Sequence, residues 1–231
     1  MSFAPGTADA IAALGLPVLC ADTCSILDIV RDPIRRDLQP EHIEVAKHLV
    51  NEMKATRLVA LFAQQVTREL ADNVDNVIAV SKASLDKLKG ELLRIQRLAQ
   101  VHRPSENLTL DFIDQHVTDA RTLYNEWTGA ARVVEHSADA AMRAYERVSQ
   151  CLAPAQRGKD SSKDCLVIET YFEAVTELRE AGLEAPIVFL TRNSADYEVD
   201  RKLEKGLAVR FEELRMGYAP NTSRAKHLLA L

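Results

Sequence analysis

The stretch "LPVLCADTCSILDIV", residues 16–30, decides how the rest of the chain is interpreted. It contains a short apolar run, from Val18 to Ala21, that stops at Asp22. A short apolar run bounded by polar residues is typical of a buried strand. The pattern therefore predicts a strand with an acidic residue directly after its carboxyl end, and a turn at Thr23 that leads into the next element.

Composition limits the class of protein. The chain has 231 residues, of which 47% are hydrophobic and 27% are charged, as in ordinary globular proteins. This length suits one large domain or a domain with an insertion. No apolar run approaches the roughly 18–20 residues that cross a membrane, and the first residues lack the basic region of a signal peptide. We therefore expect a cytoplasmic protein with no membrane association.

Charge and cysteine content add two further expectations. The net charge is −5, so any binding of nucleic acid must depend on a local basic patch. The four cysteines form no CxxC pair, which favours reduced thiols in or near the core over a zinc site or a disulfide framework.

Further strands and helices follow in alternation. Apolar spacing predicts helices over 40–56, 64–100, 109–155 and 162–181, with an interruption of the second near Asp72–Asn76 or at Gly90. Short apolar runs predict strands over 57–63, 185–191 and 206–214. Strands that alternate with helices favour a mostly parallel central sheet with helices on its faces, an α/β fold of three layers, α/β/α.

Acidic residues stand where such a sheet forms its sites, beyond the carboxyl ends of the strands. Asp22 follows the first strand, Glu69 comes within about two turns of the second, and Asp196 follows the third. Asp164 opens the helix that leads into the third strand. These four carboxylates, which are far apart in the sequence, are expected to converge on one edge of the sheet.

Convergence of acids indicates a cation, because carboxylates packed together repel one another unless a positive charge neutralises them. Oxygen ligands without histidine are typical of Mg²⁺ or Mn²⁺. Such an ion holds a phosphate and lowers the pKa of a bound water. The pattern therefore favours hydrolysis of phosphodiesters.

At this point the chain resembles a known family. The stretches "LCADTCSIL", "VTRELADN", "KDCLVIETY" and "FLTRNSADY" resemble the four signature blocks of the PIN domain, a nuclease fold. The blocks occupy roughly 18–80 and 158–213. The resemblance implies the catalytic acids Asp22, Glu69, Asp164 and Asp196, with Asp22, Asp164 and Asp196 as ligands of Mg²⁺ or Mn²⁺.

Residues 81–157 depart from a compact PIN domain. This stretch of about 75 residues is helical in pattern, and the resemblance places it among larger bacterial members with extra helices. We expect one PIN-like domain over 1–231 with a helical insertion at about 81–157 that lies outside the sheet.

Other polar residues of the blocks are candidates for binding substrate or orienting the acids. They are Thr23, Lys163, Thr191, Arg192 and Asn193. Basic residues beside the acids, including Arg157 and Lys159, lie where a phosphate backbone would run. Four alternatives stay open: Asp164 as a simple helix cap, Asp160 as the acid in its place, Asp196 paired with Arg192 or Lys163, and Asp28 as a charge on a helix face.

The acids thus predict metal-dependent hydrolysis of phosphodiesters. The resemblance implies that the chain is an endoribonuclease acting on RNA, in a toxin or defence role with an antitoxin protein as partner. A homodimer is a further candidate assembly. Two other functions compete with this one. The same site would serve a nuclease acting on DNA, and a PIN-like domain without activity would serve as an RNA-binding or assembly module.

Overall fold

A parallel sheet forms the centre of the computed structural model, which describes residues 2–103 and 107–231. The sheet has five strands in the order β3-β2-β1-β4-β7, and every pair is parallel. In chain order these are β1 (Val18–Ala21), β2 (Val59–Ala63), β3 (Arg132–Val134), β4 (Ile187–Leu190) and β7 (Met216–Ala219). A two-stranded antiparallel ribbon, β5 (Glu198–Val199) and β6 (Lys202–Leu203), lies apart from it.

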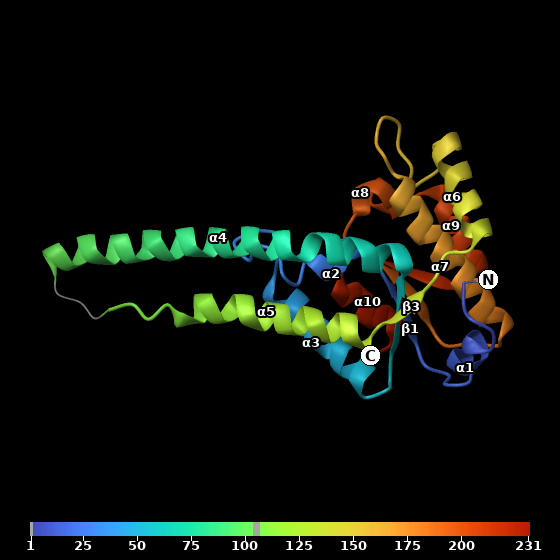
Figure 1. Ribbon diagram of the computed structural model, residues 1–231, viewed down its shortest axis with the longest axis horizontal. Helices are drawn as coiled ribbons and strands as arrows, with labels where there is room; N and C mark the ends of the chain where they lie inside the picture. The colour runs from blue at the N-terminus through green and yellow to red at the C-terminus, as the bar shows by residue number, and fades with distance from the viewer. Residues whose placement is uncertain (1, 104–106) are drawn as a thin grey trace.

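Helices cover both faces of the sheet (Figure 1). α7 (Ser162–Glu180) contacts β2 and β3, and α1 (Thr7–Ala12) and α6 (Ala138–Gln150) pack against it. α10 (Thr222–Leu229) contacts β1, β4 and β7 on the other face, beside α3 (Pro40–Lys54), which in turn contacts α5 (Asp111–Ala130). The remaining helices are α2 (Thr23–Leu27), α4 (Gln64–His102), α8 (Ser194–Tyr197) and α9 (Lys205–Glu213). The predicted three-layer α/β/α architecture is confirmed.

The central strands are apolar throughout because both of their faces are covered. Every residue of β1, β2 and β4 is buried. Tyr171 of α7 fastens the carboxyl ends of two of them: its hydroxyl lies 2.6 Å from the carbonyl oxygen of Ala21 and accepts the backbone N–H of Ala63 at 3.0 Å. These two hydrogen bonds hold the carboxyl ends of β1 and β2 together at the edge of the sheet where the acids lie.

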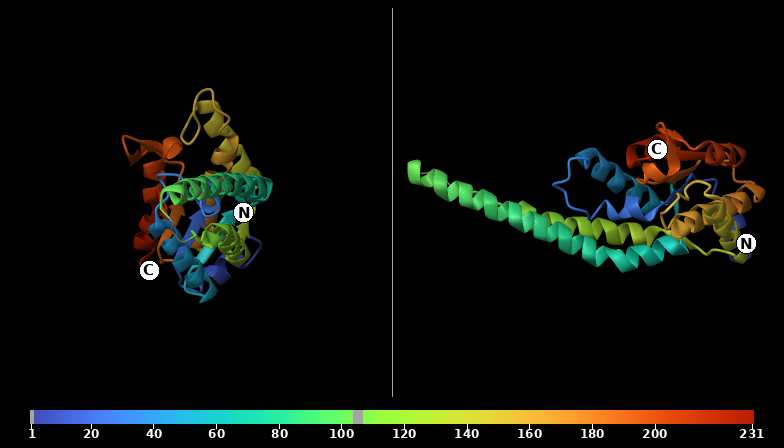
Figure 2. Two further views of the ribbon diagram at one scale, coloured as in Figure 1. Left: turned by 90° about the vertical axis from the view of Figure 1, so that its left-hand side faces the viewer. Right: turned by 90° about the horizontal axis from the view of Figure 1, so that it is seen from above.

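A long helical arm projects from this body (Figures 1 and 2). α4 has 39 residues, about 58 Å at 1.5 Å per residue, and is continuous through Gly90 and Asp72–Asn76, so the expected interruption is wrong. α5 runs back along it, with Lys89 bonded to Asp114 and Arg121 bonded to Asp75. An apolar contact of Leu85 with Leu110 and Ile113 holds the two helices together.

The segment 81–157 differs from the expectation in one respect. It is helical in α4, α5 and α6, but Arg132–Val134 forms β3, the edge strand of the central sheet. The pairing of Val133 and Val134 with Phe62 and Ala63 stabilises this short strand, and helical patterning on either side hid it. Trp127 and Tyr124 of α5 are buried in the main core and anchor the base of the arm.

The last part of the chain corrects a second prediction. The stretch 206–214 is not a strand but lies mostly in α9, which the Glu204 carboxylate caps by accepting the N–H groups of Gly206 and Leu207. The strand on this side of β4 is β7 instead. Among the helices of the described residues, none is both long and apolar enough to cross a bilayer.

Candidate active site

Asp22 occupies the carboxyl end of β1 and caps α2. It is 4% exposed, and its Oδ1 accepts the backbone N–H of Thr23 at 2.8 Å. Its Oδ2 accepts the hydroxyl of Thr191 at 2.7 Å and the thiol of Cys24 at 3.2 Å. Thr191 follows the neighbouring strand β4, so the parallel pairing of β1 with β4 brings the two side chains together.

Glu69 comes from the second turn of α4 and reaches Asp22 through one intervening residue. Its Oε2 accepts the hydroxyl of Thr23 at 2.7 Å, and its Oε1 accepts the amide of Gln65 at 2.8 Å. Val66 and Leu70, on either side of it in the helix, are buried and fix the rotation of α4. The expectation that Thr23 orients an acid agrees with this contact.

Asp164 is the third residue of α7 and does not cap that helix, which has Ser161 at its cap position. Asp160 supplies the local hydrogen bonds instead, accepting the backbone N–H of Ser162 at 3.1 Å and its hydroxyl at 2.6 Å. Glu169 points elsewhere and is buried in ion pairs with Arg143 and Arg147. Asp164 lines the cavity that is described next, whereas Asp160 does not.

One cavity of about 450 Å³ collects most of the predicted residues. Those that line it are Asp22, Thr23, Glu69, Asp164, Arg192 and Asn193. Thr191 is fully buried behind Asp22. Lys163 is exposed and does not line the cavity, so the structure does not bring this residue to the acids.

Asp196, on α8, is held beside the other acids by three donors. It is 6% exposed and accepts the amides of Gln156 at 2.9 Å and Asn193 at 2.6 Å, and it forms an ion pair with Lys159. Neither Arg192 nor Lys163, the two partners considered from the sequence, is its partner. Asn193 hydrogen-bonds a carboxylate, as expected, and Lys159 is the basic residue of its segment that reaches the acids.

The electrostatics of the cluster follow from burial and like charge. Burial raises the pKa of Asp22, and the hydrogen bonds from Thr191, Cys24 and Thr23 oppose this. Burial raises the pKa of Asp164 to about 7, with the charges of Asp22 and Asp196 adding to the effect and Lys159 opposing it. The hydrogen bond to Asp196 in turn raises the pKa of Lys159. Asp164 is therefore influenced by the charges of Asp22, Asp196 and Glu69, which come from three other segments of the chain.

The donor set suits a hard divalent cation, because it consists of carboxylate oxygens with no histidine. Within residues 2–103 and 107–231, no three His, Cys, Asp or Glu side chains are grouped as a ready metal site. Asp22 and Asp164 face the cavity and fit the role of ligands, with Glu69 beside them. Asp196 does not line this cavity and is paired with Lys159, and it would join the other acids if a metal ion took the place of that ammonium group.

Comparison with known proteins agrees with this arrangement. A family model described as a PIN domain matches residues 19–197, more than half of the chain. The chain belongs to the PIN domain family. Members of this family are generally nucleases that depend on divalent metal ions. No curated protein and no solved structure matches the chain.

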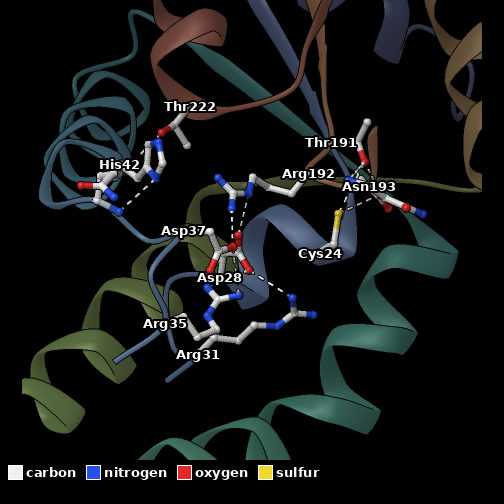
Figure 3. Close-up of polar contacts among 12 residues, drawn as sticks. Cys24, Asp28, Arg31, Arg35, Asp37, His42, Thr191, Arg192, Asn193 and Thr222 are labelled. Atoms are coloured by element: carbon white, nitrogen blue, oxygen red, sulfur yellow. Dashed lines mark hydrogen bonds and ion pairs between the residues drawn. The ribbon is translucent and has the colours of Figure 1, made fainter. Parts of the chain in front are cut away.

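The structure adds residues to the cavity that the sequence did not single out. Asp28, read as a charge on a helix face, is buried and bonded to arginines, and Arg31, Arg35 and Asp37 line the same cavity (Figure 3). The only sequence signal is the dense charge of "VRDPIRRDL", residues 30–38, in the segment after α2. Arg192, which is far away along the chain, joins this group through ion pairs with Asp28 and Asp37.

Proposed function

We propose that this PIN domain is a metal-dependent endoribonuclease that hydrolyses phosphodiester bonds of RNA. The observation that carries the proposal is the crowding of Asp22, Glu69 and Asp164 in one cavity, where the pKa of Asp164 is raised to about 7. Strongly shifted acids in a cavity are characteristic of functional sites, since folding alone gains nothing from them. RNA as substrate comes from the family resemblance.

The residues of the site have separate tasks in this proposal. Asp22, Asp164 and, once released from Lys159, Asp196 would hold Mg²⁺ or Mn²⁺, which supplies a water of lowered pKa when bound. Thr191 and Thr23 hold the carboxylates of Asp22 and Glu69 in place through their hydroxyl groups. Arg192, which lines the same cavity, offers positive charge to the phosphate backbone.

A cleavage assay tests the proposal and separates it from its competitors. The purified chain is incubated with single-stranded RNA and DNA of matched sequence, in Mn²⁺, in Mg²⁺ and in chelator. We expect RNA to be cut internally in either metal and to stay intact in chelator. Cutting of DNA alone would favour the DNA nuclease, and retention of RNA without cutting under any condition would favour the binding module.

The toxin role, with an antitoxin or a second copy of the chain as partner, belongs to the same proposal. Apolar side chains near the end of α4 support a protein partner: Ile95 is 57% exposed, Leu98 58% and Val101 80%. Exposed apolar patches of this kind commonly mark interaction surfaces. Light scattering of the purified chain distinguishes a homodimer from a monomer that awaits another protein.

A further inference from the structure

Three arginines that line the cavity form one wall of it around Asp28 (Figure 3). Arg31 and Arg35 lie in the segment between α2 and α3, and Arg192 lies just beyond β4. All three side chains are partly accessible, with 37%, 26% and 23% of their surface exposed, respectively. Guanidinium groups in an acidic protein, gathered beside a nuclease site, call for a physical explanation.

Asp28 forms ion pairs with all three arginines. Its side chain is 11% exposed, and Arg192 Nε lies 2.9 Å from its Oδ2. Its Oδ1 is 3.2 Å from Arg31 and 3.4 Å from Arg35. One carboxylate cannot neutralise three guanidinium groups, so this wall retains positive charge around a fixed, buried anchor.

Asp37 offers a second carboxylate to the same arginines, but from the surface. Its side chain is 60% exposed; one oxygen lies 2.9 Å from Arg192 and 3.7 Å from Arg35. Ion pairs of exposed groups contribute little stability, typically about 0–1 kcal/mol. Asp37 can therefore leave the arginines at low cost when a stronger anion arrives.

We propose that Arg31, Arg35 and Arg192 form a phosphate-binding site for the nucleic acid strand, and that Asp37 occupies the place of the phosphate until the strand binds. Guanidinium groups bind carboxylates and phosphates with the same forked geometry, which makes one a natural substitute for the other. The acids and arginines share one cavity, so the site would hold a phosphate close to the bond that is cut. This inference rests on the proposed nuclease function.

A second ion pair in the molecule supplies matched controls. Arg215 pairs with Glu184, and both side chains are exposed. Arg215 directly precedes β7, at the edge of the sheet opposite to the acids. Arg215→Gln and Glu184→Gln therefore change charge and break an ion pair in the same way as Arg192→Gln and Asp37→Asn, away from the cavity.

Binding of a labelled single-stranded RNA, measured by fluorescence anisotropy in chelator, tests the proposal without cleavage. We expect Arg192→Gln to weaken binding about tenfold, the typical effect of losing one charged hydrogen bond. The slope of log affinity against log salt should also fall by about 0.7, the value for one phosphate contact on a single strand. Asp37→Asn should strengthen binding about three- to fivefold, because the competing carboxylate is gone. The two control variants should bind as the wild type does.

The same assay shows whether the bound phosphate is at the 5′ end of the strand or inside it. If the site takes a terminal phosphate, RNA with a 5′-phosphate binds the wild type more tightly than RNA with a 5′-hydroxyl, and Arg192→Gln removes the difference. If it takes an internal phosphate, both RNAs respond equally to Arg192→Gln. The proposal is overturned if Asp37→Asn behaves like Glu184→Gln, or if Arg192→Gln behaves like Arg215→Gln.

Cleavage of the same RNA in Mn²⁺ keeps the two proposals separate. If the variants bind RNA in the predicted order but no protein cuts it, the proposed nuclease function is wrong and the phosphate site stands. If all variants cut RNA efficiently and bind it equally well, the proposed phosphate site is wrong and the nuclease function stands.

Discussion

The carboxylates on the two walls of the cavity differ in whether they are paired with a positive charge. Asp28 and Asp37, on one wall, are both bonded to arginines. Asp22, Glu69 and Asp164, on the other, form no ion pair with any residue in the described ranges, and the pKa of Asp164 is raised to about 7. Each carboxylate of the arginine wall thus has a cationic partner in the folded chain, whereas the carboxylates of the acid wall have none, as the proposed metal site requires.

Asp196 lies between these extremes and shows how the chain limits the repulsion. Its ion pair with Lys159 places one positive charge next to the acids, and that charge opposes the rise in the pKa of Asp164. Lys159 therefore partly compensates the cluster while no metal is bound. The remaining repulsion is a cost to folding that is consistent with a functional site.

The largest effect is expected for an acid that has no partner. Asp164→Asn should reduce metal-dependent cleavage by more than about 100-fold, because even residues that merely support a metal ligand are worth 10- to 100-fold. The fold should persist, since the amide has nearly the same shape as the carboxylate. Asp160→Asn is the control, four residues earlier and outside the cavity, and should cut RNA at a rate close to that of the wild type. Equal activity of both variants would remove Asp164 from the site.

A smaller effect is expected on stability at the arginine wall. Asp28→Asn leaves three guanidinium groups without their buried anchor and should reduce the free energy of unfolding by about 2 kcal/mol, below the 3–5 kcal/mol typical of fully buried pairs, because the arginines are partly exposed. Asp37→Asn should change it by less than about 1 kcal/mol. Urea denaturation of both variants measures the contrast, and equal losses would show that burial does not distinguish the two carboxylates.

A further effect concerns pH. The pKa of Asp164 is about 7 in the folded chain and about 3.9 in an unfolded one, so the folded state binds the proton more tightly. Its favourable contribution is complete below about pH 4 and is lost as pH rises to about 7. Asp164→Asn cannot ionise, so in chelator its stability relative to the wild type should increase between pH 5 and pH 8. A constant difference across this range would mean that Asp164 is not in a crowded, buried cluster.

Sequence was a sufficient guide where neighbouring residues determine the structure. Asp22 and Thr191 directly follow strands, and strands of a parallel sheet end at one edge, so their meeting could be anticipated. Asp164 was recognisable because it precedes a run of buried residues in α7. The family resemblance connected these segments and added Glu69, whose position depends on the rotation of a long helix.

Distant contacts explain what the sequence did not predict. Val133 and Val134 become a strand only by pairing with β2. The stretch 206–214 lies mostly in a helix that packs against β7, the strand that pairs with β4 in its place. The sequence could suggest the pairs of Asp28 with Arg31 and Arg35, which are near it in the chain, but not its pair with the distant Arg192. Lys159 reaches Asp196 where Lys163 does not, and this choice depends on the course of the loop before α7.

Calorimetric titration of Mn²⁺ into the metal-free chain tests most directly whether the unpaired acids form a metal site. The wild type should bind Mn²⁺ near pH 7 and release roughly half a proton, because Asp164, with a pKa of about 7, must lose its proton to act as a ligand. The release, obtained from buffers of different ionisation enthalpy, should vanish by about pH 8.5. Asp164→Asn should bind at least about tenfold more weakly and lack the part of the proton release that comes from Asp164. If the wild type binds no Mn²⁺, or if both proteins bind it equally well, the acid wall is not a metal site.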